Sequence, residues 1–379
     1  MKKILLIHNK YRKLSGEDVA VENEIKYLAR FFILDSLIFT NEDNLNINTT
    51  TSFITNKNKT SIDIVKEKLR KNSYDYIYIH NTWFTASLGV INEVVKYNIP
   101  VFLKLHNFRF DCINGIHFKN NSICHDCNNS SRSQGIKNKC YDNSHFKSIL
   151  ATNYSINLLK ILKSNNLNIF TLTKFQKDYL VKLGVSQKLI KVVPNHIPSY
   201  ENQTKNDKKN DKKVFLYAGR LSYEKGIIEL IEIWLELDNP NLILEIIGEG
   251  PLYETIKEKI KNVNNIKLFS SIDHENIIKK IATMNAVILP TKLYEGQPTI
   301  LSEASMLGVP SIFADNGGIA EFFPNNYQLK FKSFYELKKI LLEINNFDLI
   351  ELGINVNIFL KTKLEANKLE KSFEDAIQH

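Results

Sequence analysis

The chain of 379 residues contains no continuous apolar run as long as a membrane-spanning helix. Its first residues, MKKILLIH, form an apolar run that is too short and too soon polar for a signal peptide. They are typical of a buried first strand, so we expect a cytoplasmic protein. Hydrophobic residues make up 43% of the chain, which is enough for two cores of ordinary size.

Glycine-rich dinucleotide motifs and RNA-binding aromatic motifs are missing too. The turn after the first expected strand contains Gly16 but lacks the further glycines that an NAD fingerprint needs. The chain has 50 Lys and Arg against 41 Asp and Glu, a formal charge of +9. That charge can attract phosphorylated substrates, anionic lipid surfaces or nucleic acid, or it can simply reflect a lysine-rich composition. Without aromatic RNA motifs, we do not expect a nucleic-acid partner.

Cysteine occurs in one stretch only. The four residues are Cys112, Cys124, Cys127 and Cys140. A Cys-x-x-Cys pair flanked on each side by one cysteine suits a tetrahedral structural zinc site, in which His125 could replace one thiolate. Reduced thiols and disulfides are the alternatives, although a reducing cytosol disfavours disulfides. The surrounding segment 107–145 is poor in apolar residues, so it would not fold stably without a cross-link such as a metal ion or a disulfide.

Strand and helix patterns alternate along the whole chain. Strands are expected at about 3–8, 33–38, 75–79, 100–105, 167–171 and 189–193, and then at about 214–218, 242–247, 266–269, 286–289 and 310–313. This alternation predicts parallel sheets with helices on both faces. Between the two series, the segment 201–213 has no apolar residue and reads as a linker or solvated loop.

Two carboxylates, Glu295 and Glu303, stand eight positions apart across a predicted helix start. Pro298 fits the first helical turn, and the run 299–307 is amphipathic. The unpaired N–H groups of such a helix form an anion site that suits a pyrophosphate. Glu295 could accept hydrogen bonds from sugar hydroxyls, and Glu303 from both hydroxyls of a ribose. The plain alternative is an ordinary amphipathic helix with two solvated acids.

Two cations, Arg220 and Lys225, stand five positions apart after the expected strand 214–218. The carboxyl ends of strands in open α/β sheets are where ligands bind. Arg220 and Lys225 could therefore neutralise two phosphates, although an exposed basic turn is the alternative. The segment 244–251 repeats the strand and turn, with glycines that let backbone approach a ligand.

In their order and spacing these motifs resemble the retaining glycosyltransferases of family 4. The residues that carry the likeness are Gly219-Arg220-Leu221-Ser222 with Lys225-Gly226, Ile247-Gly248-Glu249-Gly250-Pro251, Glu295 to Glu303 and Gly308-Val309-Pro310, together with His80-Asn81-Thr82, Leu105-His106-Asn107 and Val192-Val193-Pro194-Asn195. The likeness covers nearly the whole chain. It departs at His196, where the family often has glycine, so no backbone donor contact is carried over to that residue.

The resemblance implies an α/β fold of the GT-B type, with two Rossmann-like domains facing each other across a cleft. It assigns 1–196 to an acceptor-side domain with the cysteine-containing insert 107–145, which is expected to border the acceptor. It assigns 197–354 to a nucleotide-sugar-binding domain. The C-terminal segment 355–379 is expected to be a helix that returns to the first domain.

The resemblance also implies roles for single residues. The expected catalytic residues are His106, Glu295, Arg220 and Lys225. His8, His80 and His106 all follow expected strands, and His106 best matches the family's histidine near the transferred sugar, where it would orient the donor or stabilise developing charge. The expected donor-binding residues are Gly16, Gly219, Arg220, Lys225, Gly248, Ser271, Ile272, Glu295, Gly296, Thr299, Ile300 and Glu303. The chain has no Asp-x-Asp triplet for a divalent ion, so catalysis without a metal is expected.

These features predict a retaining transferase that moves a sugar from a nucleoside diphosphate donor, a UDP- or GDP-sugar, to a glycan or lipid-linked oligosaccharide. Such enzymes build capsule, lipopolysaccharide or exopolysaccharide, with peripheral contact to the inner membrane as a further expectation. The loop 268–272 is expected to read the donor base. An epimerase is disfavoured by the glutamate pair, and a phosphorylase would need a longer chain. A non-catalytic basic membrane-surface adaptor would make Glu295, Glu303 and His106 dispensable.

Overall fold

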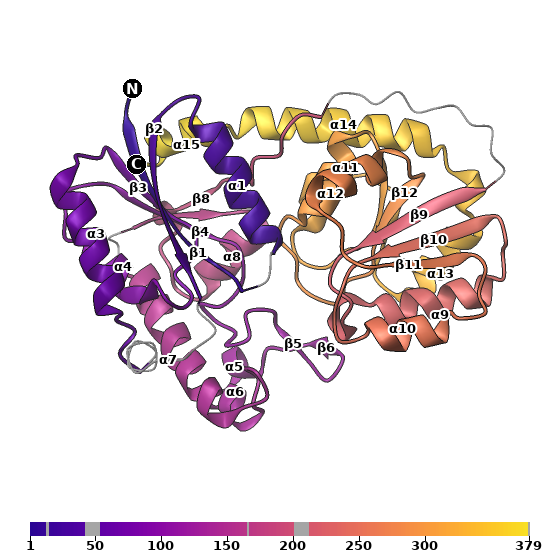
Figure 1. Ribbon diagram of the computed structural model, residues 1–379, viewed down its shortest axis with the longest axis horizontal. Helices are drawn as coiled ribbons and strands as arrows, with labels where there is room; N and C mark the ends of the chain where they lie inside the picture. Colours follow the sequence, from indigo (N-terminus) through magenta and orange to yellow (C-terminus); the bar gives the residue numbers. More distant parts are fainter. Residues whose placement is uncertain (13–14, 42–53, 165–166, 201–211, 378–379) are drawn as a thin grey trace. The chain divides into compact units, whose positions relative to one another are not determined.

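The computed structural model describes residues 1–12, 15–41, 54–164, 167–200 and 212–377. It contains two compact units, each built around its own six-stranded parallel sheet (Figure 1). The first unit comprises Met1–Lys119, Cys124–His196 and Asn367–His379, and the second comprises Asn120–Ile123 and Ile197–Ala366. The expected linker 201–213 lies almost entirely outside the described residues.

The sheet of the first unit has the order β2-β1-β3-β4-β7-β8. Its strands are β1 (Lys3–Lys10), β2 (Ile33–Thr40), β3 (Tyr76–Ile79), β4 (Val101–Leu105), β7 (Asn168–Thr171) and β8 (Ile190–Val192). The helices are α1 (Gly16–Leu28), α3 (Lys59–Lys71), α4 (Ser87–Val94), α7 (His145–Leu162), α8 (Lys174–Lys182) and α15 (Leu369–Ile377). Central strands such as β1 are buried on both faces, which explains their continuous apolar sequence. All six strands expected in this half are confirmed.

The sheet of the second unit has the order β11-β10-β9-β12-β13-β14. Its strands are β9 (Lys213–Ala218), β10 (Leu242–Ile247), β11 (Ile266–Phe269), β12 (Ala286–Leu289), β13 (Ser311–Ala314) and β14 (Lys330–Phe331). The helices are α9 (Ile227–Leu237), α10 (Tyr253–Lys259), α11 (His274–Ala282), α12 (Thr299–Met306), α13 (Phe334–Leu342) and α14 (Leu349–Ala366). The five expected strands are confirmed, whereas β14 was not predicted.

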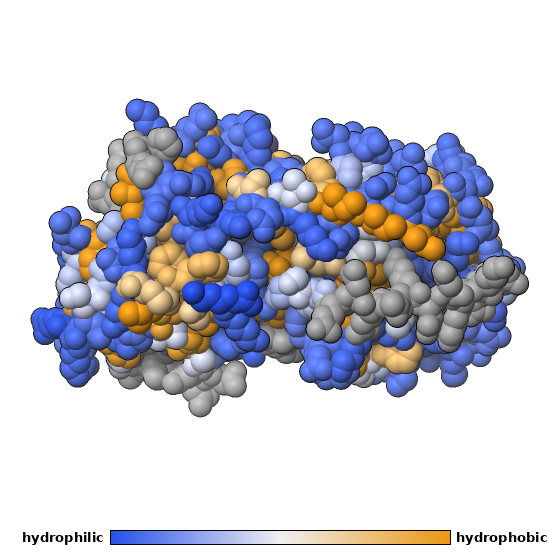
Figure 2. Space-filling model, turned by 90° about the horizontal axis from the view of Figure 1, so that it is seen from above, coloured by the Kyte–Doolittle hydropathy of each residue, from blue (hydrophilic) through white to orange (hydrophobic). Residues whose placement is uncertain are grey.

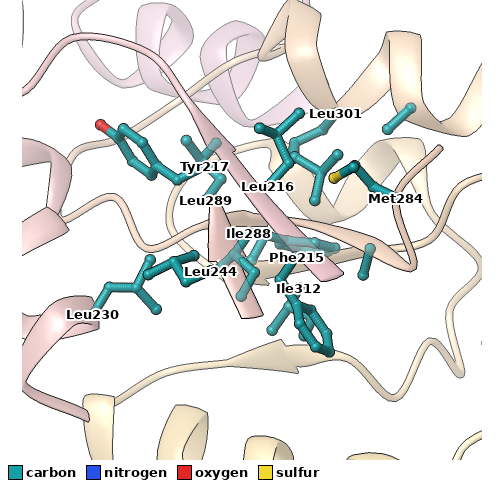
Figure 3. Packing of buried hydrophobic residues seen from close by; sticks show 14 of the residues in the cluster. Phe215, Leu216, Tyr217, Leu230, Leu244, Met284, Ile288, Leu289, Leu301 and Ile312 are labelled. Atoms are coloured by element: carbon teal, nitrogen blue, oxygen red, sulfur yellow. The ribbon is translucent and has the colours of Figure 1, made fainter. Parts of the chain in front are cut away.

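The core of the second unit fixes α12 against the sheet. Figure 3 shows Leu216 of β9 beside Leu301 of α12, and both belong to one cluster of buried residues. Phe215, the neighbour of Leu216, points to the opposite face of the strand, as the two-residue period of a strand requires. This packing holds the start of α12 at the carboxyl ends of β9 and β12, where the expected donor-binding residues lie.

The C-terminal segment contains two helices instead of the single returning helix that the sequence predicts. The longer helix, α14, belongs to the second unit, and the chain rejoins the first unit at Asn367 instead of residue 355. In the first unit, α15 inserts Phe373 into the core, where its ring stacks on Tyr76 with 5.6 Å between ring centroids. The aromatic packing of Phe373 therefore anchors the end of the chain to the first sheet.

One face of α14 exposes an apolar stripe. Ile350, Ile354 and Ile358 recur every four residues, and each is more than half exposed. Figure 2 shows apolar atoms gathered in a row over this helix. Among the described residues, none of the helices combines the length and the apolar content needed to cross a bilayer.

Candidate functional site

Two loops of the second unit touch backbone to backbone at the carboxyl ends of β9 and β10. Gly219 donates its N–H to Ile247 at 3.0 Å, and Leu221 donates to Glu249 at 2.8 Å. A Cβ at Gly248 would lie only 2.0 Å from the Gly219 carbonyl oxygen, so no other residue fits there. Glycine at 248 thus lets the two loops approach each other, whereas the sequence had suggested an approach of backbone to ligand.

Lys225 and Glu295 are brought together from loops 70 positions apart in the chain. The ammonium of Lys225 lies 2.5 Å from Oε1 of Glu295, and the hydroxyl of Thr291 donates to the same oxygen at 3.2 Å. Both charged side chains are about one-fifth to one-quarter exposed, at 19% for Glu295 and 25% for Lys225. A bound phosphate that reached Lys225 would therefore have to displace Glu295 or share the cation with it.

The backbone around Glu295 is fixed by two glycines. Gly318 donates its N–H to the Glu295 carbonyl at 2.8 Å. Gly317 has a φ of +81°, and a Cβ there would lie 2.6 Å from the same carbonyl oxygen. This close approach places the Glu295 side chain before α12, as the sequence predicts.

Arg220 follows β9 and has an exposed side chain. Its backbone carbonyl accepts a hydrogen bond from the buried Tyr217 hydroxyl at 2.7 Å. Burial raises the pKa of Tyr217, and the carboxylates of Glu224 and Glu295 raise it further. The phenol therefore stays protonated and holds the turn that presents the guanidinium of Arg220.

Glu303 lies inside α12 and has a partner that sequence reasoning missed. Its Oε1 is 2.6 Å from Nε2 of His274, the first residue of α11. Glu303 is 2% exposed, whereas the side chain of His274 is 37% exposed. A ribose that bound to Glu303 would therefore have to displace His274 or share the carboxylate with it. The position of His274, just after the loop 268–272, was the signal that could have found it.

The other expected donor-binding residues surround these carboxylates. Gly296 lies in the loop before α12, and Thr299 and Ile300 form its first turn, with Pro298 at the N-cap position. On the neighbouring loop, Ser271 donates to Glu249 at 2.7 Å, and the side chain of Ile272 is 42% exposed.

In the first unit, three histidines lie within or just after β1, β3 and β4; His8 and His80 are buried, and His106 is half-buried. Nε2 of His8 lies 2.9 Å from Asp18, the residue that closes the capping box at the start of α1 beside Gly16. Nδ1 of His80 lies 3.0 Å from Nε2 of His106. Burial lowers the pKa of His106 well below its ordinary value, and the charge of Lys104 lowers it further. His106 is therefore a neutral imidazole at pH 7.

A second cluster joins the Gly16 turn to the loop after β4. Tyr11 donates to Glu17 at 3.2 Å, and the amide of Asn107 donates to the same carboxyl group at 3.4 Å. Burial raises the pKa of Glu17 to about 8, with a further rise from Asp18. Sequence reasoning did not single out Glu17, although it follows the predicted Gly16.

The cysteine-containing insert has only short elements: β5 (Phe118–Lys119), β6 (Ser122–Ile123), α5 (Asp126–Asn129) and α6 (Ser133–Lys137). All four cysteines are free and line one small cavity together with Ile113 and His117. Burial raises the pKa of the Cys127 thiol to about 11, which keeps that thiol protonated when no metal is near. In the described part of the chain, no three His, Cys, Asp or Glu side chains are already arranged to hold a metal ion.

The comparisons with known proteins agree with these motifs. Residues 199–348 match the family model of glycosyl transferases group 1. The amylovoran biosynthesis glycosyltransferase AmsD of Erwinia amylovora is 29% identical over 151 residues, which are 39% of this chain and 43% of AmsD. Residues 199–348 are thus similar to the group 1 glycosyltransferases.

Solved structures place the chain in the GT-B fold. The lipopolysaccharide outer core galactosyltransferase WaaB in its apo form has a TM-score of 0.65 at 16% identity, over 99% of both chains. HepE of Anabaena, solved in complex with UDP-glucose, has a TM-score of 0.63 at 13% identity, over 100% of this chain and 99% of that one. At these identities the likeness concerns the fold, and the sequence match to AmsD spans less than half of that relative.

Proposed function

We propose that this protein is a retaining glycosyltransferase that moves a sugar from a nucleoside diphosphate donor to a glycan or lipid-linked acceptor in bacterial surface polysaccharide synthesis. The observation that carries the proposal is the meeting of Lys225 and Glu295 at the carboxyl edge of the second sheet. That edge is where α/β sheets bind ligands. A cation for phosphate and a carboxylate for sugar hydroxyls are the two groups that a nucleotide sugar requires.

In the proposed roles, Arg220 and Lys225 bind the diphosphate with the start of α12. Glu295 accepts hydrogen bonds from the transferred sugar, and Glu303 accepts them from the ribose. Arg220, Lys225 and the start of α12 would stabilise the departing diphosphate without a divalent ion. His106 would act on the transferred sugar.

The names of the relatives support the donor and the pathway class. AmsD is named for amylovoran biosynthesis and WaaB for the lipopolysaccharide outer core. HepE was solved with UDP-glucose, so a UDP-sugar is the first donor to test. The net charge of +9 supports a peripheral contact with an anionic membrane surface, where a lipid-linked acceptor would lie.

The proposal is tested by measuring the melting temperature of the full chain with UDP-, GDP-, ADP- and CMP-sugars. A ligand at one hundred times its Kd stabilises a protein by about 2.7 kcal/mol, so the cognate donor should stand out. Slow hydrolysis of that donor should accompany the shift. A protein that binds a donor but never hydrolyses it would be the adaptor, and one that responds to no nucleotide would refute the donor site.

Replacing Glu303 with Gln is expected to weaken nucleotide binding by about tenfold to a hundredfold, the value of a hydrogen bond to a charged group. The cause is the loss of a carboxylate that accepts both ribose hydroxyls. Isothermal titration with the cognate nucleoside diphosphate gives the Kd, and circular dichroism checks the fold. Glu254→Gln on the exposed face of α10 is the matched control. Unchanged affinity for every nucleotide would remove the ribose role of Glu303.

We also propose that the four cysteines hold a structural zinc ion. Four thiols around one cavity are a donor set that zinc prefers, and metal binding would deprotonate them and draw them together. The reaction itself takes no step through this ion. The zinc ion would cross-link the insert, which has too few apolar residues to form a stable core of its own.

Protein purified under reducing conditions is expected to contain about one zinc ion per chain. Chelation should lower the melting temperature, by about 2–4 °C for each kcal/mol lost, and leave donor hydrolysis intact over short times. Cys127→Ser should lose the zinc, whereas Ser133→Ala in the same insert should keep it. Elemental analysis that finds no zinc in the reduced protein would exclude the site.

A further inference from the structure

Four buried side chains connect the interior of the first unit to His106. The carboxylate of Glu24 accepts hydrogen bonds from the ammonium of Lys104 and, at 2.8 Å, from the hydroxyl of Tyr78. Nε2 of His80 lies 3.7 Å from the same carboxylate, and Nδ1 of His80 lies 3.0 Å from Nε2 of His106. Glu24 and Lys104 are fully buried, and His80 is 4% exposed.

The position of each proton in this series of contacts follows from the charge of Glu24. Three groups donate hydrogen bonds to Glu24: the Lys104 ammonium, the Tyr78 hydroxyl and, at 3.4 Å, the backbone N–H of His196. A carboxylate surrounded by such donors acts as an acceptor only. Within the described residues, Nε2 of His80 is buried and has no hydrogen-bond partner, and the Glu24 carboxylate lies 3.7 Å from it. An N–H group facing a buried carboxylate is favoured over a lone pair, because the lone pair would repel the charge.

If Nε2 of His80 carries its proton, the neutral ring has a lone pair on Nδ1. The contact at 3.0 Å then requires His106 to donate through its own Nε2. Burial lowers the pKa of both histidines well below the ordinary value, so neither ring has a second proton to spare. The remaining atom, Nδ1 of His106, is left with a lone pair.

We infer that Glu24 and His80 are positioning residues that hold His106 in its Nε2–H tautomer, so that His106 presents Nδ1 as a hydrogen-bond acceptor to a hydroxyl of the transferred sugar. No described residue forms a hydrogen bond with Nδ1 of His106, and the ring is half-buried instead of enclosed. A hydrogen-bond acceptor at this position favours a sugar hydroxyl that donates a hydrogen bond to it. The sugar-binding part of this inference rests on the proposed function, whereas the tautomer part does not.

The tautomers are measured directly by NMR of the full chain labelled with 15N in its histidine rings. The two ring nitrogens of a neutral histidine have well-separated shifts, and signals that vanish in His80→Leu or His106→Asn identify the two rings. The wild-type protein is expected to have the proton on Nε2 in both His80 and His106. A proton on Nδ1 of His80 would overturn the role of Glu24, and a proton on Nδ1 of His106 would overturn the whole inference.

Two variants at His80 test by function whether Glu24 and His80 set the tautomer of His106, a coupling that we call the relay. His80→Leu removes the acceptor, so His106 should populate both tautomers and donor hydrolysis should fall by about fivefold to tenfold, the value of one neutral hydrogen bond. His80→Asn keeps an oxygen that can accept from His106 and should restore both the tautomer and most of the rate. Nucleotide Kd should stay unchanged in both, as in the surface control His145→Leu. A single retained tautomer in His80→Leu would exclude the relay.

These readouts separate the two proposals. If the wild-type protein hydrolyses no nucleotide sugar, the proposed function fails, and the NMR signals of His80 and His106 still decide the relay. If the donor is hydrolysed but the wild-type tautomers are reversed, the relay fails and the proposed function stands.

Discussion

Replacing His106 with Ala is expected to lower the rate of donor-sugar hydrolysis by about two to three decades, the usual cost of removing one preorganised polar contact to the reacting centre. Glycosyl transfer passes through a state in which positive charge builds on the sugar ring. A neutral imidazole that accepts a hydrogen bond from that sugar interacts more strongly as the charge grows. The loss should therefore appear in the transition state and not in ground-state binding.

The measurement needs two numbers for wild type and variant, the hydrolysis rate and the nucleotide Kd. The Kd should stay within a few fold, because the nucleotide-binding residues are proposed to belong to the second unit. His145→Ala, at the start of α7, is the matched histidine control and should change neither number. Wild-type hydrolysis in His106→Ala would assign this residue to the core packing of the first unit.

Replacing Lys225 with Ala is expected to reduce the affinity for the nucleoside diphosphate far more than that for the nucleoside. Loss of one positive contact to the departing diphosphate should cost about 2 to 4 kcal/mol in the transition state, which is roughly thirtyfold to a thousandfold in rate. The structure adds a second cause. Without Lys225, the carboxylate of Glu295, which lies 2.5 Å from that ammonium, would face the phosphate unneutralised.

A double variant separates these two causes. If repulsion from Glu295 contributes, Lys225→Ala with Glu295→Gln should bind the diphosphate better than Lys225→Ala alone, although sugar transfer should remain poor. Lys257→Ala on the exposed side of α10 is the lysine control. Equal losses of affinity for nucleoside and diphosphate in Lys225→Ala would show that Lys225 does not bind phosphate.

The sequence pattern was sufficient for most of the fold because parallel strands buried on both faces have continuous apolar runs. β14 was missed since its two residues, Lys330 and Phe331, are too few to produce a pattern. The break between α14 and α15 was missed as well, because neither glycine nor proline marks it near Asn367. The last helix begins where the packing of Phe373 into the core of the first unit requires it, and no local sequence signal marks that point.

The local parts of the candidate site were also predictable from the sequence. A helix that starts after Glu295, and a basic turn after β9, depend on residues close together in the chain. The cysteine cluster was predictable as a set of candidate ligands. The structure brings its four thiols to one cavity but does not by itself form a metal centre.

The sequence by itself determined the alternation of strands and helices, the positions of the turns and the residue types available at each strand end, because these depend on neighbours within a few residues. Only the tertiary structure decided which side chains meet. Lys225 with Glu295, His274 with Glu303 and Lys104 with Glu24 are separated by 70, 29 and 80 positions. Such contacts arise when packing brings together helices, strands and loops that are distant in the chain, and no local pattern encodes them.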